Sequence, residues 1–388
     1  MNRTRVALVF GTRPEAVKLA PVHAALMRRG DKFETRVIVT GQHREMLQQM
    51  LDAFGVVPDV NLAIMQEGQS LAEITCRALT GLQAVFHDER PDVILVQGDT
   101  TTVFAGALAA FYERVAVGHV EAGLRTSDKF SPYPEEINRR LTAPLADMHF
   151  AATRRARRNL LAENVDPQSI FVTGNTVVDA LQTVASSGRS LQGTDFGWVD
   201  DLEGRLVLVT AHRRENLGVP LARVCEAIQR IVERYSDVTV LWPLHFNPLV
   251  RKTAHELLDN VPRVRLAEPP DYLDFVPLMQ RADLIITDSG GVQEEAPALG
   301  VPVLVVRDTT ERPEGVEAGI ARLVGTDADA IFEAAAALFE NPSEYRRMAE
   351  GGCPYGDGRA SERNCDALES WFDQRAERPA DFDWTAGG

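Results

Sequence analysis

The sequence has few cysteines, and none of them form a pair with metal-binding spacing. Its four cysteines, Cys76, Cys225, Cys353 and Cys365, are scattered through 388 residues. Because no C-x-x-C occurs, neither a zinc site nor a disulfide framework is predicted. We therefore expect no metal, and reduced thiols of this kind fit a cytoplasmic protein.

Long apolar runs are also missing. The N-terminal run at residues 6–10 (VALVF) is too short for a signal peptide, and Arg13 follows it closely. No segment approaches the length needed to span a membrane. The sequence thus predicts no membrane partner and a cytoplasmic location.

An excess of positive charge is absent as well. The chain carries 41 Lys and Arg against 56 Asp and Glu, a formal charge of −15. This balance argues against nucleic acid as the main partner, but a local group of arginines could still bind an anionic ligand. The basic run at residues 154–158 (RRARR) is interpreted as a solvated helix face.

Two common nucleotide motifs do not occur where they would be expected. The first predicted strand is not followed by G-x-G-x-x-G, which disfavours a bound dinucleotide. The glycine-rich stretch at residues 289–291 is not followed by Lys and Ser or Thr, so it is not a Walker A loop. We expect no cofactor.

What the sequence does contain is a repeated alternation of apolar strands and helical segments. Length alone favours two domains, and strands alternating with helices predict an α/β fold with doubly wound parallel sheets. We expect a first domain at residues 1–175, a second at residues 176–360 and a tail at residues 376–388, with residues 381–388 disordered.

The stretch at residues 284–296 (LIITDSGGVQEEA) combines a strand, a glycine-rich turn and a helix start. Unpaired backbone N–H groups and the helix dipole make such a turn an anion site, to which Ser289 adds a hydroxyl donor. Glu295 would lie one turn into the helix, where a carboxylate could accept bonds from a ribose. The alternative is an ordinary helix cap.

A similar turn follows the first strand. In residues 11–15 (GTRPE), Thr12 and Glu15 have capping-box spacing and Pro14 suits a first helical turn. Arg13 and Lys18 would then place two cations where a diphosphate could lie.

Three carboxylates are candidates for acid–base chemistry. Asp99 and Glu121 follow predicted strands, where ligands of doubly wound sheets bind, and Glu135 begins a helix after a proline-rich loop. Each has an ordinary alternative. Asp99 could cap the next helix, Glu121 could pair with Arg125, and Glu135 could simply favour a helix N-terminus. In the second half, His212 could be a plain loop residue and Phe275 a core aromatic.

Eight motifs, in order along the chain, resemble those of the non-hydrolysing UDP-N-acetylglucosamine 2-epimerases. They are GTRPEA (11–16), GDTTT (98–102), HVEAGLR (119–125), PEE (134–136), GNT (174–176), HRRE (212–215), TDSGGVQEE (287–295) and RDTTERPE (307–314). The resemblance implies a glycosyltransferase-B-like architecture, with two Rossmann-like domains facing across a cleft and a final helix at about residues 361–375 returning to the first domain.

The resemblance also implies reversible conversion of UDP-GlcNAc to UDP-ManNAc, without nicotinamide or metal, by a homodimer that supplies surface-polysaccharide synthesis. A base removes the C2 proton, UDP leaves C1 to give 2-acetamidoglucal, and UDP adds back after protonation of the other face. We do not assign which face of C2 is served by each of the three carboxylates Asp99, Glu121 and Glu135. The competing hypotheses are a glycosyltransferase on the same fold and a non-catalytic UDP-sugar sensor.

Particular roles are implied residue by residue. The implied catalytic residues are Asp99, Glu121, Glu135 and His212. The implied substrate-binding residues are Arg13, Lys18, Arg139, His245, Phe275, Ser289, Gly290, Gly291, Glu295 and Arg312. Gln42, His43 and Gln69 match a second, allosteric site.

Two positions depart from the family pattern. Pro270 replaces a polar residue near the uracil position, and Gly68 stands where some relatives carry an arginine of the allosteric site. The departure at Gly68 leaves the pattern of that second site incomplete, and the sequence is compatible with UDP-GlcNAc or a close relative such as a C3-amino or uronic-acid variant.

Overall fold

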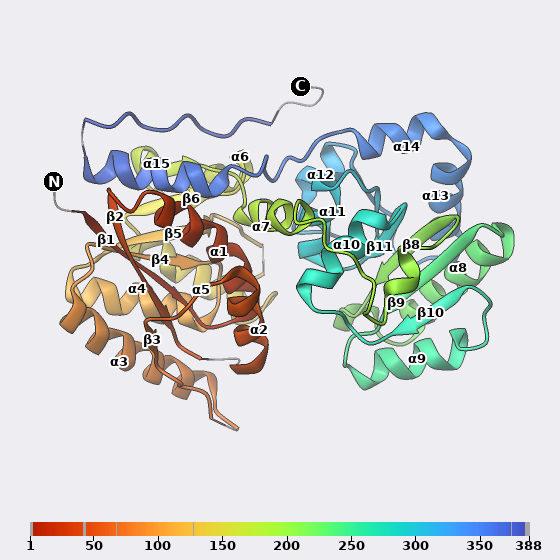
Figure 1. Ribbon diagram of the computed structural model, residues 1–388, viewed down its shortest axis with the longest axis horizontal. Helices are drawn as coiled ribbons and strands as arrows, with labels where there is room; N and C mark the ends of the chain where they lie inside the picture. Colours follow the sequence, from red (N-terminus) through yellow and green to blue (C-terminus); the bar gives the residue numbers. More distant parts are fainter. Residues whose placement is uncertain (1–2, 42–43, 67, 127, 374, 385–388) are drawn as a thin grey trace. The chain divides into compact units, whose positions relative to one another are not determined.

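The structure is a computed structural model that describes residues 3–41, 44–66, 68–126, 128–373 and 375–384. The chain divides into two compact units. Unit 1 comprises Met1–Ala180 and Tyr355–Asp383, and unit 2 comprises Leu181–Pro354 and Trp384–Gly388 (Figure 1). Each unit is built on one parallel sheet with helices on its faces.

Unit 1 contains a seven-stranded sheet in the order β3-β2-β1-β4-β5-β6-β7. In chain order its strands are β1 (Thr4–Phe10), β2 (Phe33–Val39), β3 (Val60–Asn61), β4 (Val93–Gln97), β5 (Ala116–Ala122), β6 (Met148–Ala151) and β7 (Ile170–Val172). All pairs are parallel. Central strands β1 and β4 are buried along most of their length, which explains the continuous apolar runs at residues 6–10 and 93–96.

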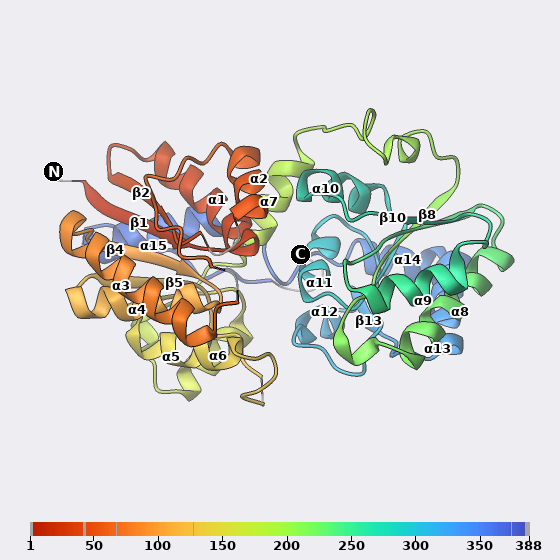
Figure 2. The ribbon, with the colours of Figure 1, turned by 90° about the horizontal axis from the view of Figure 1, so that it is seen from below.

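The helices of unit 1 lie between these strands. They are α1 (Arg13–Arg28), α2 (Arg44–Phe54), α3 (Leu71–Glu89), α4 (Thr101–Glu113), α5 (Glu135–Thr142), α6 (Arg154–Ala162), α7 (Thr176–Ala185, which crosses into unit 2) and α15 (Ala360–Phe372). Helices α3 and α4 pack side by side (Figure 2). The C-terminal α15 packs on α1, where Arg29 pairs with Glu362 and Asp366.

Unit 2 contains a six-stranded parallel sheet in the order β10-β9-β8-β11-β12-β13. Its strands are β8 (Arg205–Thr210), β9 (Val238–Pro243), β10 (Val264–Ala267), β11 (Leu284–Thr287), β12 (Val303–Val305) and β13 (Ala321–Leu323). Its helices are α8 (Val219–Arg234), α9 (Pro248–Leu258), α10 (Tyr272–Arg281), α11 (Gly290–Ala298), α12 (Pro313–Glu317), α13 (Ala328–Glu340) and α14 (Pro342–Ala349). Its core includes Val207, Trp242 and Ile286.

Each sheet has one point where the strand order reverses. In unit 1 this point lies between β1 and β4, and in unit 2 it lies between β8 and β11. At such a point, the helices that follow the two neighbouring strands cover opposite faces of the sheet. This arrangement leaves a crevice at the carboxyl ends of the two strands, and ligands of doubly wound folds bind there. The turns after β1, β4, β8 and β11 are therefore the first places to look for a site.

The prediction of a disordered C-terminus is wrong for Asp381 and Phe382. The Phe382 amide donates to the Val172 carbonyl at 2.6 Å, and the Asp381 carboxylate accepts from the Val172 amide at 3.0 Å. These bonds cover the edge of β7, which would otherwise expose unpaired backbone groups.

Among the described residues, no helix is both long enough and apolar enough to cross a membrane.

Candidate functional site

Glu121 lies at the carboxyl end of β5 in an unusual backbone conformation. Its φ is 63°, in the left-handed region, and the pairing of β5 with β6 shifts register between Val120 and Ala122. A non-glycine residue is rarely held there, and such strain, of about 1–3 kcal/mol, is concentrated at functional sites. The bulge turns a carboxylate that is only 5% exposed away from the regular strand.

Two donors hold this carboxylate. Lys18 of α1 and Gln97, the last residue of β4, both contact Oε2 of Glu121. Glu121 thus pairs with Lys18. Arg125, the alternative partner considered from the sequence, pairs with Glu163 at 2.7 Å.

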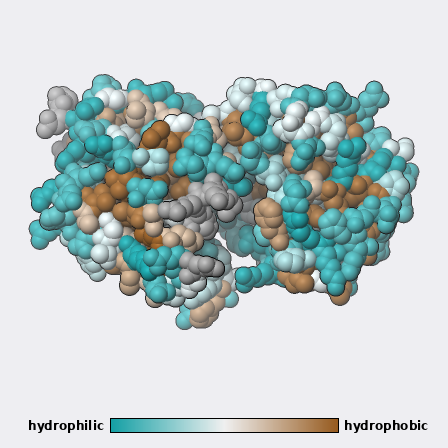
Figure 3. Space-filling view, turned by 60° about the horizontal axis from the view of Figure 1, so that its bottom comes forward, coloured by the Kyte–Doolittle hydropathy of each residue, from teal (hydrophilic) through white to brown (hydrophobic). Residues whose placement is uncertain are grey.

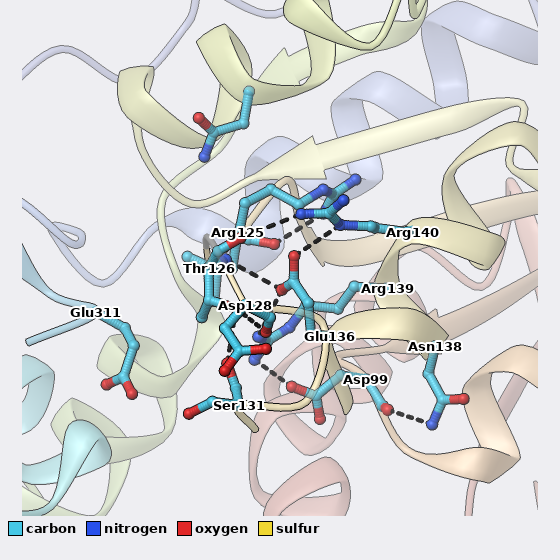
Figure 4. A network of polar contacts seen from close by, with 12 residues as sticks. Asp99, Arg125, Thr126, Asp128, Ser131, Glu136, Asn138, Arg139, Arg140 and Glu311 are labelled. Carbon is cyan, nitrogen blue, oxygen red and sulfur yellow. Dashed lines mark hydrogen bonds and ion pairs between the residues drawn. The ribbon is translucent and has the colours of Figure 1, made fainter. Parts of the chain in front are cut away.

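Asp99 follows the neighbouring strand. It does not cap the next helix, because Thr100 is the N-cap of α4 and its side chain accepts from the Val103 amide. The Asp99 carboxylate pairs with Arg139 of α5, and the Asn138 amide donates to the Asp99 carbonyl at 2.9 Å (Figure 4). Asp99 is therefore held by its side chain and by its backbone.

The ends of β4 and β5 are fastened to each other through Gly98. The Gly98 amide donates to the Val120 carbonyl at 3.0 Å, and the Gly98 carbonyl lies 2.7 Å from Nε2 of His119. Burial lowers the pKa of His119 to about 4, so the imidazole is neutral at neutral pH and Nε2 donates. These bonds fix the relative positions of the backbones that carry Asp99 and Glu121.

Glu135 is the first residue of α5, one turn before Arg139. Its Oε2 is buried and has no hydrogen-bond partner among the described residues. The next residue, Glu136, is fully buried and accepts from the Thr126 amide at 3.0 Å and from Arg140 at 2.8 Å (Figure 4). Glu136 therefore anchors the loop, while Glu135 has a carboxylate oxygen that no donor satisfies.

The turn after β1 has the predicted capping box at the start of α1. The Glu15 carboxylate accepts from the amides of Gly11 and Thr12 at 3.0 and 2.7 Å, and from the Thr100 hydroxyl at 2.7 Å. Burial raises the pKa of Glu15 despite these bonds. Arg13 is half-buried in the first turn of the same helix.

In unit 2, the turn after β11 begins α11 at Gly290. Ser289 is the N-cap, but its side chain makes no capping hydrogen bond. A Cβ on Gly290 would lie 3.8 Å from Nη2 of Arg213 and 4.0 Å from Nη2 of Arg312, so two guanidinium groups lie beside this helix N-terminus. Backbone amides, a hydroxyl and two cations together suit a diphosphate.

Glu295 lies one turn into α11, as predicted. It is 7% exposed, and its Oε1 accepts from the Tyr272 hydroxyl at 2.9 Å. Its Oε2 lies 3.6 Å from where a Cβ on Gly291 would be, which is an ordinary van der Waals contact. Arg312, the N-cap residue of α12, pairs with the buried Glu294.

His212 follows β8, and its ring stacks on that of His245, with centroids 4.9 Å apart and planes 11° apart. The backbone amides of His212 and Arg213 each donate to Oδ2 of Asp288 at 2.8 Å. Burial lowers the pKa of His212, while the charge of Asp288 opposes that shift.

The remaining predicted residues are not joined to these groups. Phe275 is half-buried on α10. Gln69 bonds within its own loop, accepting from the Gln66 amide at 2.7 Å and donating to the Ile64 carbonyl at 2.9 Å. Gln42 and His43 lie outside the described residues.

Five residues that were not expected from the sequence also take part in these contacts. They are Gln97, Asn138, Arg213, Tyr272 and Asp288. Asp288 lies inside the motif TDSGG and Arg213 lies beside His212, so a role for both residues could have been predicted from the sequence. No group of three or more His, Cys, Asp or Glu that could hold a metal ion occurs in the part of the chain the structure describes.

Two parallel α/β units with polar groups at their switch points define a doubly wound α/β protein with candidate ligand sites at the carboxyl ends of its strands. Comparison with known proteins makes this class specific. The family model described as UDP-N-acetylglucosamine 2-epimerase matches residues 25–369. The UDP-N-acetylglucosamine 2-epimerase of Bacillus subtilis is 52% identical over 382 residues, covering 98% of this chain and 99% of that protein. The chain belongs to the UDP-N-acetylglucosamine 2-epimerase family.

Solved structures agree with this assignment. A crystal structure of a putative UDP-N-acetylglucosamine 2-epimerase from Listeria monocytogenes has a TM-score of 0.92 at 47% identity, covering 99% of this chain and 100% of that one. The Neisseria meningitidis enzyme bound to UDP-GlcNAc has a TM-score of 0.84 at 45% identity, covering 94% and 99%. A glycosyltransferase at 13% identity and a TM-score of 0.65 shares the fold alone, which confirms the glycosyltransferase-B-like class.

Proposed function

We propose that this chain converts UDP-GlcNAc reversibly to UDP-ManNAc by inverting C2. The observation that carries the proposal is the pair of carboxylates, Asp99 and Glu121, at the ends of adjacent strands. Each has its own cation, Arg139 for Asp99 and Lys18 for Glu121. Membership of the family supports the same reaction.

The reaction needs groups that move a proton at two faces of one carbon. The C2 proton is only weakly acidic, so a positioned base must remove it and a positioned acid must return it. Asp99, Glu121 and Glu135 are the carboxylates that would serve. No described residue donates to the buried Oε2 of Glu135, so this oxygen is not committed to another contact of the chain.

The leaving group gains negative charge as the C1–O bond breaks. Electrons of the C2–H bond form the C1–C2 double bond of 2-acetamidoglucal, and the C1–O pair leaves with UDP. Donors aimed at that charge lower the barrier. In unit 2 the groups that would bind the nucleotide and its diphosphate are His212, Ser289, Gly290, Glu295 and Arg312, with Arg213 added by the structure.

The experiment compares Asp99→Asn with Asp92→Asn. Asp92 precedes the same strand β4 and accepts from the Arg5 amide at 2.8 Å, so it is a matched carboxylate at the opposite edge of the sheet. We expect Asp99→Asn to lose UDP-ManNAc formation by about 10²-fold or more while binding UDP, and Asp92→Asn to retain turnover. Wild-type turnover in Asp99→Asn would refute the proposed role of this carboxylate.

We also propose a homodimer formed through unit 1. Apolar side chains gather on the face that carries α3 and α4 (Figure 3), and Leu71, Phe111, Tyr112 and Leu141 are 41–59% exposed. Sedimentation of Phe111→Glu tests this. We expect monomers for that variant and dimers for Phe246→Glu, which alters a side chain in unit 2 that is 67% exposed. Dimers in both variants would contradict this interface.

A cytoplasmic location and a supply of UDP-ManNAc to surface-polysaccharide synthesis complete the proposal. A strain without this chain should lose N-acetylmannosamine from its surface polymers. The wild-type chain should restore it and Glu121→Gln should not. Restoration by Glu121→Gln would separate the polymer phenotype from catalysis.

A further inference from the structure

Asp288 is a fully buried carboxylate at the carboxyl end of β11, next to Ser289. Its Oδ2 accepts three hydrogen bonds, from the amides of His212 and Arg213 at 2.8 Å and from the Asn216 side chain at 2.9 Å. These bonds tie the turn after β8 to the turn after β11. They account for one oxygen of the carboxylate only.

The second oxygen, Oδ1, is buried and has no hydrogen-bond partner among the described residues. Nδ1 of His212 lies 3.7 Å from this oxygen. A buried carboxylate oxygen without a donor is costly, so such an atom in a native site requires an explanation. A small rotation of the imidazole would bring Nδ1–H within hydrogen-bond distance.

The stack with His245 restricts how His212 can rotate. The His245 ring is itself oriented, because its Nδ1 accepts from the Asn247 amide at 3.1 Å, which leaves its proton on Nε2. With His212 stacked on this ring and Nδ1 toward Asp288, Nε2 is the nitrogen left to face a ligand. The side chain of His212 is 33% exposed, so a ligand can reach it.

We propose that Asp288 is a positioning residue for His212. It accepts Nδ1–H through Oδ1, fixes the tautomer and orientation of the imidazole, and so presents Nε2 to the diphosphate of the nucleotide. This deepens the proposed function and rests on it for the identity of the ligand. The same carboxylate accepts from the His212 backbone amide through Oδ2, so Asp288 positions both the backbone and the imidazole of His212.

Four groups act on the charge of His212. Asp288 and Glu215 favour the imidazolium, whereas His245 and Arg213 disfavour it. Removing the Asp288 charge therefore lowers the pKa of His212 further. An isosteric asparagine keeps an acceptor for the two backbone amides but places an NH₂ group, or at best a weaker acceptor, opposite Nδ1.

The test compares Asp288→Asn with Asp283→Asn. Asp283 precedes β11 as Asp288 follows it, and it accepts from the Leu206 amide at 2.8 Å, so it controls for loss of a strand-end carboxylate. In the ligand-free protein, NMR of ¹⁵N-histidine follows the His212 titration, with His212→Gln to assign the signal. We expect the titration midpoint to fall in Asp288→Asn and to stay unchanged in Asp283→Asn.

Kinetics supply the second readout. We expect kcat of Asp288→Asn to fall by about 10- to 100-fold, the range for losing a group that orients a functional histidine, with a smaller change in KM. An unchanged titration midpoint in Asp288→Asn overturns the proposal even if kcat falls. In that case Asp288 acts only through the backbone.

The tautomer of His212 in the wild-type protein tests the proposal without depending on whether a variant folds. We expect neutral His212 to carry its proton on Nδ1, with and without bound UDP. A proton on Nε2 in both states overturns the proposal. Failure of the proposed function can be distinguished from failure of this proposal. If the wild-type protein did not turn over UDP-GlcNAc, the proposed function would fail, but the titration and tautomer of His212 could still be measured and would still test the role of Asp288.

Discussion

Lys18 and Glu121 form an ion pair in which the lysine side chain is 17% exposed and the carboxylate 4% exposed. Lys18 lies on α1 and Glu121 in the bulge of β5, so the pair joins two elements of unit 1 that are far apart in sequence. Removing one partner of a buried pair leaves an uncompensated charge, which costs about 3–5 kcal/mol. The fold therefore depends on the same contact that orients the candidate base.

Glu121→Gln tests the chemical part of this contact. The amide keeps the size of the side chain but cannot take up a proton, so we expect kcat to fall by about 10²- to 10⁴-fold. UDP affinity, measured by calorimetry, should stay near that of the wild type. Glu163→Gln, which alters a carboxylate paired with Arg125 in the same unit, should leave kcat unchanged. A Glu121→Gln enzyme with wild-type kcat would exclude Glu121 from proton transfer.

Ser289→Ala distinguishes an anion site from an ordinary helix cap. Because the Ser289 side chain makes no capping bond, its loss should leave thermal stability nearly unchanged. We expect UDP affinity to fall by about 10- to 100-fold, the value of one hydrogen bond to a charged group.

Thr153→Ala is the control for that experiment. The Thr153 hydroxyl accepts from the Ala156 amide at 3.1 Å as a true N-cap of α6, so its loss should cost about 1 kcal/mol of stability without affecting UDP binding. If Ser289→Ala lost stability like Thr153→Ala while binding UDP normally, the serine would be a cap only.

Tyr272→Phe removes the hydroxyl that Glu295 accepts. The carboxylate would lose one of its donors, and we expect weaker UDP binding by about 10-fold with kcat little changed, since a ribose contact is the same in the ground and transition states. Binding calorimetry with UDP and steady-state kinetics measure the two effects. A fall in kcat at unchanged UDP affinity would place Glu295 in the chemistry instead.

Stability should depend on pH through the buried histidines of unit 1. His119 and His149 face each other on β5 and β6, and burial lowers their pKa values to about 4 and about 3. Between these values and the unfolded pKa of about 6.5, the unfolded chain binds protons that the folded chain does not. The free energy of unfolding should therefore fall as pH drops below 6.5, by roughly 2 kcal/mol per histidine at pH 5.

Hydrogen exchange of the β5 and β6 amides at pH 7 and pH 5 measures this loss locally. His149→Gln should remove about half of the pH dependence, since one of the two histidines is gone. His87→Gln, at a side chain that is 64% exposed, should change nothing. If the free energy of unfolding of His149→Gln depended on pH as strongly as that of the wild type, other groups would be responsible for the pH dependence.

The strands and the carboxylates at their ends could be predicted from the sequence, because buried parallel strands have uninterrupted apolar runs. Residues 284–286 and 93–96 are such runs, and Asp288 and Asp99 follow within three residues of their ends. Polar residues just after a strand mark the carboxyl edge of the sheet, which is where the switch-point rule places ligands.

Other features could not be predicted because they depend on contacts distant in sequence. Gln97 looks like one polar residue in an apolar strand, and its role follows only from the register with Val120 and the bulge at Glu121. Propensity gives no reason to expect a left-handed conformation for a glutamate. Disorder is expected at Asp381 and Phe382 because they lie near the chain end, and their order comes from bonds to β7 about 209 residues away.

The most direct test of the proposed reaction is proton NMR of the purified protein with UDP-GlcNAc in D₂O. The proposed mechanism removes the C2 proton and returns one from solvent, so UDP-ManNAc should appear with deuterium at C2, and Glu121→Gln should show neither product nor exchange. Conversion that kept the original hydrogen at C2 throughout, or release of free N-acetylmannosamine and UDP in place of UDP-ManNAc, would contradict reversible epimerisation by solvent-exchanging proton transfer.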